Sequence, residues 1–133
     1  EYPIGLILAG VVAGTATIIG FYRERSFYPT MLIVIASYYV LFATMGAFSV
    51  RTLVIEIFVA GGFLLCAVLG FKRNLWFVVV ALIGHGAFDL AHDLGVDNPG
   101  VPQWWPGFCL AFDVAIGGWL GMQLLTRQSD RFA

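Results

Sequence analysis

Long runs of apolar residues are the feature that most constrains this chain. A helix that crosses a bilayer needs about 20 mostly apolar residues, because about 30 Å of hydrocarbon is traversed at about 1.5 Å per residue. Five segments of the sequence meet this requirement: residues 4–21, 30–49, 53–71, 75–93 and 107–126. Lipid leaves backbone groups no water to bond, and five strands could not close a membrane barrel. We therefore predict an all-α integral membrane bundle of about five transmembrane helices, with residues 1–133 forming a single domain.

The composition supports the same class. Of the 133 residues, 60% are hydrophobic and 11% are charged, whereas soluble domains have roughly 25% charged residues. The formal net charge is −1 and no cluster of basic residues is present, so nothing in the sequence would neutralise the phosphates of a nucleic acid. The two cysteines, Cys66 and Cys109, lie within apolar segments and are too few for a disulfide framework.

The first apolar segment, residues 4–21, lies close to the beginning of the sequence. The sequence begins at Glu1 without an initiator Met, so we expect further residues to precede it in the complete protein. Neither a basic n-region nor a clear small-residue cleavage site accompanies the segment. We therefore interpret it as a transmembrane span and not as a signal peptide.

The basic residues predict an orientation in the membrane. With five spans, six of them fall on one side: Arg23, Arg25, Lys72, Arg73, Arg127 and Arg131. The opposite side has only Arg51, and residues 94–105 contain no basic residue. Because cytoplasmic loops are enriched in Lys and Arg, we predict that the C-terminus is cytoplasmic and the N-terminus lies outside.

Small residues recur at positions where helices could approach one another closely. They form three patterns: Gly10-x-x-x-Gly14, Gly61-Gly62 and Gly117-x-x-x-Gly121. Such spacing permits tight backbone contact between helices in lipid. Packing within one bundle is favoured over a dedicated dimer interface.

The end of the fourth segment concentrates residue types that ligate metals. His85, Asp89 and His92 are spaced i, i+4 and i+7, so at about 100° per residue they fall within about 60° of one another on a helix. Asp93 lies at the edge of this face, where it and His92 could equally be solvated at a helix end. Imidazole and carboxylate ligands suit Zn, Cu, Fe or Mn. Because ionisable residues within spans are costly and usually functional, we predict a metal site here.

The fifth segment adds Cys109 and Asp113, which lie on one helix face at i and i+4. Counting about 1.5 Å per residue from the outer end of each helix places Asp113 and Asp89 at a similar depth, roughly 6–10 Å into the hydrocarbon. His85 lies deeper, and Glu56 of the third segment lies within its first outer turn. These depths predict a polar shaft in the outer half of the membrane that opens outward and narrows to His85.

The predicted metal ligands are His85, Asp89 and His92. Asp113 is expected to be a fourth ligand or to orient a ligating imidazole, as carboxylates beside metal-bound histidines often do. The competing interpretation is a set of buried hydrogen bonds that fix the packing of the helices, with Asp113 paired to one of the histidines.

Three further residues could contact and orient the ligands without binding the metal themselves: Asp93, Cys109 and Glu56. For Glu56 an ion pair with Arg51 is favoured, because the two lie close on the same helix. Cys109 is more often a small packing residue than a thiolate ligand. Tyr38 and Tyr39 of the second segment either hydrogen-bond to the polar shaft or only pack against it.

The last third of the chain resembles a group of small uncharacterised bacterial integral membrane proteins. The resemblance rests on two patterns, which are His85-Gly86-x-x-Asp89-x-x-His92 and, after a Pro-containing loop, Trp105-Pro106-x-Phe108-Cys109-x-x-x-Asp113. In that group the residue after the second histidine is often another histidine, where this chain has Asp93. The resemblance implies that the two segments act together and that the protein lies in a bacterial inner membrane. It implies no reaction.

These observations favour a small membrane protein that binds a divalent transition metal and acts as an accessory or metal-handling subunit of a larger membrane complex. Its expected partners are the lipid bilayer and either other membrane subunits or further copies of itself. The alternative is a metal-dependent membrane enzyme, a hydrolase or an oxidoreductase, that acts on a lipid-soluble substrate. A proton or ion path is a weaker alternative, because the inner half of every predicted span lacks ionisable groups.

Overall fold

A computed structural model describes residues 1–47 and 49–129 of the chain, with the backbone alone described at residues 22, 93, 128 and 129. The described residues form five α-helices and a short 3₁₀ turn, without any strand: α1 (Tyr2–Ile19), η1 (Phe21–Arg23), α2 (Phe27–Met45), α3 (Val50–Lys72), α4 (Trp76–Gly95) and α5 (Trp105–Ser129). The all-α prediction is confirmed, and each helix overlaps one predicted segment.

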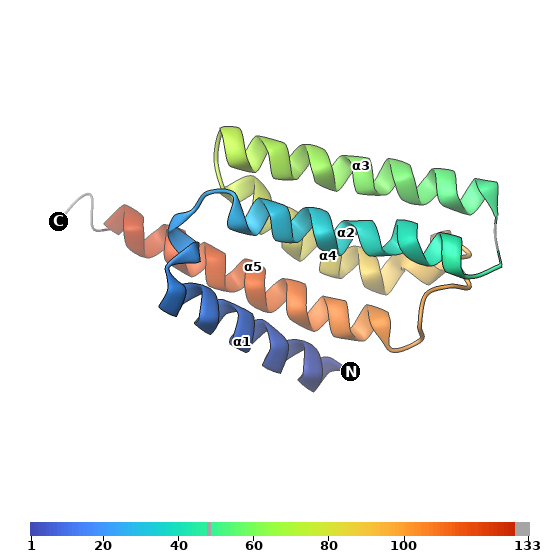
Figure 1. Cartoon of the computed structure of the whole chain (residues 1–133), viewed down its shortest axis with the longest axis horizontal. Helices are drawn as coiled ribbons and strands as arrows, with labels where there is room; N and C mark the ends of the chain where they lie inside the picture. The colour runs from blue at the N-terminus through green and yellow to red at the C-terminus, as the bar shows by residue number, and fades with distance from the viewer. Residues whose placement is uncertain (48, 130–133) are drawn as a thin grey trace.

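Four of the helices, α1, α2, α3 and α5, are long and apolar enough to cross a membrane. The apolar part of α4 is shorter, covering Trp76–His92. Its second half contains the ionisable residues that lower its hydropathy. Helix α4 packs against both α3 and α5 and lies behind α2 (Figure 1), so protein surrounds much of its polar half.

The boundaries of α2 and α3 have local causes. Helix α2 begins three residues before the predicted start because Pro29 falls within its first turn, where the missing N–H has no helical acceptor. It ends at Met45, since Gly46 lies against the α4–α5 loop so closely that a Cβ atom there would be 2.5 Å from the Gly100 nitrogen. Helix α3 then starts at an N-cap, where the Ser49 hydroxyl accepts a 3.3 Å hydrogen bond from the Thr52 N–H.

The helices run alternately in opposite directions, so the two chain ends lie at opposite ends of the bundle (Figure 1). Helix α5 packs between α4 and α1, and α3 packs against α2 and α4. Helix α1 is therefore attached to the bundle through α5. We call the end that contains residues 20–26, residues 73–75 and the C-terminus of α5 the basic end.

The basic end contains the basic residues that the sequence predicts on one side of the membrane. Of these, Arg131 lies outside the described residues. Arg25 also joins two connections there. Its guanidinium donates hydrogen bonds to the carbonyl oxygens of Gly70, Phe71 and Arg73, at 3.2, 3.1 and 3.1 Å. Because these carbonyls end α3 and have few helical partners, a cation satisfies them and complements the helix dipole.

The interior of the bundle is divided into two halves. The half nearer the basic end is apolar, and its most buried large aliphatic residues are Leu32, Val78, Leu82, Ile116 and Leu120. The half nearer the opposite end contains the buried ionisable residues: Glu56, His85, Asp89, His92 and Asp113, each 0–1% exposed. The predicted confinement of polar groups to one half of the bundle thus agrees with the structure.

The small residues divide into two groups. Gly117 and Gly121 pack against α4 inside the bundle, as predicted. Around Gly10 and Gly14 of α1, in contrast, an added Cβ atom would meet nothing within 4 Å. A different glycine makes the close contact of α1 with α5. A Cβ atom on Gly5 would overlap the Phe108 carbonyl oxygen and lie 3.1 Å from the Cβ atom of Ala111.

We expect the substitution Gly5→Ala to destabilise the protein and Gly10→Ala to leave it as stable or slightly more so. Overpacking a tight contact costs about 1–3 kcal/mol, whereas alanine at an open helical position gains up to about 1 kcal/mol over glycine. The thermal unfolding midpoint in mild detergent measures both. Equal midpoints for the two variants would contradict the placement of α1 on α5.

Candidate metal site

The polar half of α4 places three side chains on the face that points into the bundle. His85, Asp89 and His92 follow one another at helical spacing, and each is 1% exposed. Asp113 of α5 is fully buried and lies opposite them, since α4 and α5 pack along their length. A close approach of backbone makes this possible, because at Gly86 a Cβ atom would lie 3.3 Å from the Leu110 Cα atom.

His85, Asp89 and Asp113 form a compact group that could hold a metal ion. One ligand atom from each residue lies within 4.8 Å of the others. The His85 Nδ1 atom is 2.8 Å from Asp113 Oδ2 and 3.4 Å from Asp89 Oδ2. Tetrahedral ligands about 2.1 Å from a metal would lie about 3.4 Å apart. The three side chains therefore need only small adjustments to coordinate one ion.

The two carboxylates of this group have unused bonding capacity. Asp89 Oδ2 and Asp113 Oδ1 are buried and have no hydrogen-bond partner among the described residues. A buried carboxylate oxygen without a partner is costly. A cation held by the two carboxylates would offset this cost.

Tyr39 of α2 holds the other oxygen of Asp89. Its hydroxyl donates a 2.7 Å hydrogen bond to Asp89 Oδ1, and both residues are buried. This bond fixes the carboxylate so that Oδ2 faces His85. Of the two alternatives for Tyr39, hydrogen bonding to the polar residues is therefore the one observed, and the Tyr39 hydroxyl is placed where it would orient Asp89 as a candidate metal ligand.

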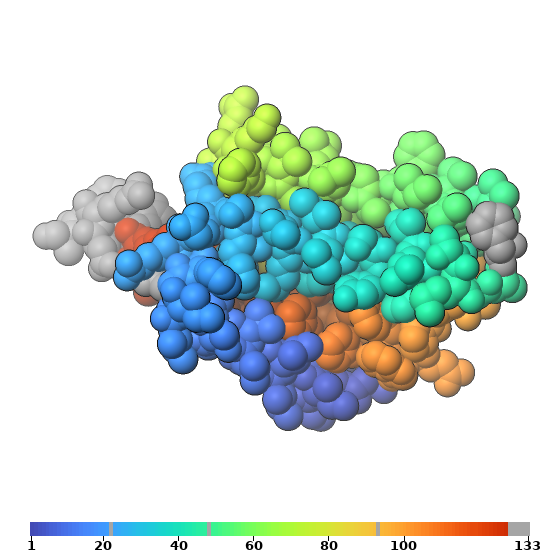
Figure 2. Space-filling view, in the orientation of Figure 1, coloured from blue at the N-terminus to red at the C-terminus, as the bar shows by residue number. Residues whose placement is uncertain are grey.

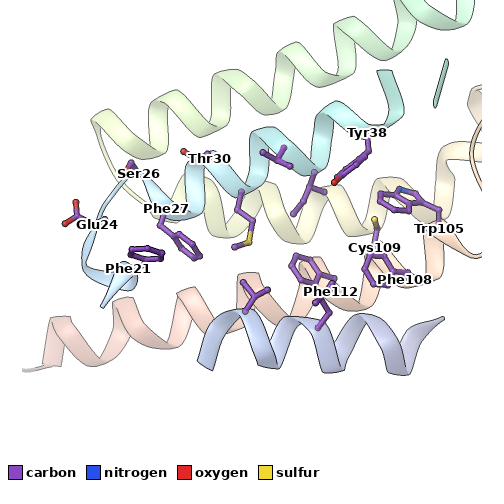
Figure 3. A pocket seen from close by; sticks show the side chains of 15 residues that line it. Phe21, Glu24, Ser26, Phe27, Thr30, Tyr38, Trp105, Phe108, Cys109 and Phe112 are labelled. Carbon is purple, nitrogen blue, oxygen red and sulfur yellow. The ribbon is translucent and has the colours of Figure 1, made fainter. Parts of the chain in front are cut away.

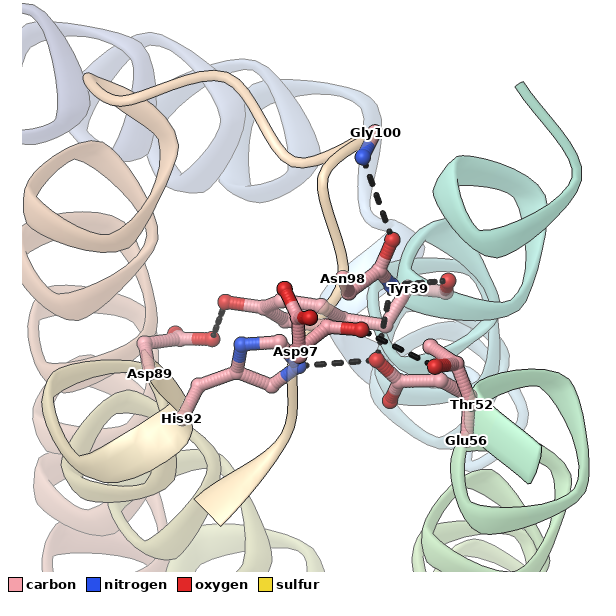
Figure 4. Close-up of polar contacts among 8 residues, drawn as sticks. All are labelled: Tyr39, Thr52, Glu56, Asp89, His92, Asp97, Asn98 and Gly100. Atoms are coloured by element: carbon pink, nitrogen blue, oxygen red, sulfur yellow. Dashed lines mark hydrogen bonds and ion pairs between the residues drawn. The ribbon is translucent and has the colours of Figure 1, made fainter. Parts of the chain in front are cut away.

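His92 belongs to a second polar group, which Figure 4 shows beside Tyr39. Its Nε2 atom lies 2.8 Å from Glu56 Oε1. Its ring stacks on the Tyr39 ring, with the centroids 4.2 Å apart and an interplanar angle of 29°. Asn98 donates to the same Glu56 oxygen at 2.7 Å and to the Tyr39 carbonyl oxygen at 3.1 Å. Tyr39 thus connects the two groups.

The α4–α5 loop covers this polar half. Besides the two hydrogen bonds of Asn98, the Thr52 hydroxyl of α3 donates to the Asp97 carbonyl oxygen at 2.9 Å. Gly100 packs directly on the end of α2, where a Cβ atom would overlap the Phe42 carbonyl oxygen. The sequence predicted a shaft that opens outward. In the structure the loop closes that end, and the polar side chains are enclosed.

The residues predicted from the sequence are thus distributed over two groups. His85, Asp89 and Asp113 come together, whereas His92 pairs with Glu56. Glu56 contacts His92 and Asn98 rather than forming the ion pair with Arg51 that the sequence favoured.

Cys109 is buried, in keeping with a packing role, and lies outside the group that could hold a metal. The side chain of Asp93 is outside the part of the structure that is described.

Sequence reasoning missed Asn98 as a functional residue. The Asn98-Pro99-Gly100 sequence is typical of a turn, and nothing in it indicates that the Asn98 side chain is buried. The sequence feature that could have indicated a buried polar partner is Glu56, because a carboxylate within an apolar helix requires one.

No protein-family model, curated protein or solved structure matches the chain.

Proposed function

We propose that this protein is an integral membrane protein that binds one divalent transition metal inside its helix bundle, with His85, Asp89 and Asp113 as ligands. The observation that carries the proposal is the group of three buried ligand atoms within 4.8 Å of one another, in which each carboxylate has an oxygen that accepts no hydrogen bond from the described residues. Helices long and apolar enough to span a membrane surround it.

Charge balance supports a metal over hydrogen bonding alone. Two carboxylates and a neutral imidazole have a charge of −2, and protonation of His85 reduces it only to −1. An uncompensated charge in an apolar interior costs several kcal/mol per ion, and the Lys and Arg residues lie in the connections and near the helix ends. A divalent cation makes the group neutral without requiring an unusual protonation state.

The types of ligand narrow the choice of metal. One imidazole nitrogen and two carboxylate oxygens suit Zn, Fe or Mn, and they suit Cu less well, because Cu(I) prefers thiolate or thioether ligands. Three protein ligands also leave a coordination position for water or substrate, which is the arrangement of catalytic metal sites and not of closed structural ones.

His92 is proposed to support the ligands and not to join them. Coordination through its Nε2 atom would require rupture of the 2.8 Å contact with Glu56, which would leave that carboxylate without its histidine partner. Its stacking on Tyr39 instead holds the tyrosine that fixes Asp89.

We expect elemental analysis of the detergent-purified protein to find close to one transition-metal ion per chain. His85→Ala and Asp113→Asn should each lower the metal content at least tenfold, because the first removes a ligand and the second replaces a charged carboxylate by a neutral, weakly coordinating amide. His92→Ala should retain the metal with about 10- to 100-fold weaker binding, the usual effect of losing a supporting residue. Metal that is absent from the wild type, or retained in His85→Ala, would contradict the proposal.

The proposed orientation places the C-terminus in the cytoplasm and the N-terminus outside, in a bacterial inner membrane. Its support is the grouping of basic residues at one end of the bundle, where Arg25 and the α3–α4 turn meet. The loop that covers the polar half would then face outward.

Labelling with a membrane-impermeant maleimide tests this orientation in intact cells, in a background where Cys66 and Cys109 are replaced by alanine. Asp97→Cys is expected to react without lysis, because Asp97 is exposed on the α4–α5 loop. Lys72→Cys, exposed at the basic end, is expected to react only after lysis. The reverse labelling pattern would show that the protein has the opposite orientation.

Enclosure of the group supports a resident metal over one that is passed to a partner, since all three ligands are 0–1% exposed. The role of an accessory subunit, which the sequence also predicts, stays a prediction. A companion protein that remains bound in mild detergent would support it, and a metal-loaded chain alone would favour an enzyme.

A further inference from the structure

A lateral groove opens between α1 and α2, and α5 forms its floor (Figure 3). In the space-filling view, atoms of α5 are visible between the two helices (Figure 2). The groove arises because α1 packs on α5 while α2 packs on α3 and α4. Its volume of about 730 Å³ falls within the range of small-molecule sites.

The shape and lining of the groove suit a hydrocarbon chain. Its walls are apolar along their length, with Leu8 and Val12 from α1, Val34 and Ile35 from α2, and Phe112 from α5. From Phe27 to Tyr38 it follows α2 for about 17 Å, at about 1.5 Å per residue. This is more than half of the hydrocarbon thickness of about 30 Å.

One end of the groove presents polar groups that could bind a head group: the Tyr38 hydroxyl, the Trp105 indole and the Cys109 thiol. The Trp105 Nε1 atom is buried and has no hydrogen-bond partner in the described part of the chain. An unpaired N–H of this kind is a donor in need of an acceptor. Among the lining residues, Glu24 at the far end has the only formal charge, and none is a Lys or Arg that would attract a phosphate.

The same end lies beside the proposed metal site. Cys109 precedes Asp113 by one helical turn and faces the same side of α5. Tyr38 adjoins Tyr39, which holds Asp89. A head group bound at this end would therefore lie about one helical turn from Asp113.

We propose that the groove binds a neutral single-chain amphiphile of the fatty-alcohol type, with its chain along α2 and its oxygen between Tyr38, Trp105 and Cys109. None of the three proposed metal ligands is among the lining residues, so this binding site goes beyond the proposed function and is tested separately from it. A phospholipid fits less well, because its phosphate would find no cation in the lining and would lie near two carboxylates.

The test uses a long-chain fatty alcohol with a diazirine in the middle of its chain, added to the detergent-purified protein and activated by light. Cross-links mapped by mass spectrometry are expected at groove residues such as Met31 and Phe112. Val34→Trp fills the groove and should reduce them at least fivefold. Its neighbour Ile33 is outside the groove lining, so Ile33→Trp should leave them unchanged. Both positions are exposed, at 47% and 37%, so both variants are expected to fold.

Labelling that is as strong at Phe58, which is 78% exposed on α3, would overturn the proposal, as would labelling insensitive to Val34→Trp. A diazirine phosphatidylcholine that labels the groove equally well would overturn the choice of a single-chain amphiphile. Metal content measured on the same samples separates the two proposals. A labelled groove in metal-free protein contradicts only the metal site, and metal-loaded protein without selective labelling contradicts only the groove.

Discussion

The contact between His85 of α4 and Asp113 of α5 is the interaction on which the polar half of this protein depends. Its 2.8 Å separation joins the two most extensively packed helices, and removal of either partner would leave a buried polar group unsatisfied. Such losses cost several kcal/mol when the remaining group is charged. Because Asp89 and His92 share a face of α4 with His85, the rotation of α4 that brings His85 to Asp113 also turns these two side chains into the bundle.

The apolar and polar halves of the interior are stabilised in different ways. Near the basic end, Leu82 and Ile116 fill the core by ordinary packing. At the other end the core consists of side chains that must each find a partner, and the α4–α5 loop supplies one through Asn98. The loop is therefore part of the core and not only a connection, which accounts for the close contact of Gly100 with the end of α2.

Much of the architecture could be predicted from the sequence, because apolar segment length and helical spacing are local properties. The spacing of His85, Asp89 and His92 placed them on one face of α4, and the depth of Asp113 matched that of Asp89. Which of these residues meet one another depends on how α3 and α2 rotate toward α4.

That rotation is set by tertiary packing, so the pairing of His92 with Glu56 could not be derived from spacing. Nor could the burial of Asn98. The groove was also beyond sequence reasoning, because it results from the attachment of α1 to α5 instead of α2. The tight glycine contact at Gly5 lies outside the predicted small-residue patterns, and only the structure identifies it.

An X-ray absorption spectrum of the bound metal in the purified wild-type protein tests the central claim most directly. The account predicts nitrogen and oxygen ligands alone, at about 2.0–2.2 Å, with the outer-shell scattering of a single imidazole from His85. A spectrum with two imidazoles would show that His92 leaves Glu56 to bind the metal. A sulfur ligand at about 2.3 Å would implicate Cys109, and either result would contradict the ligand set of His85, Asp89 and Asp113.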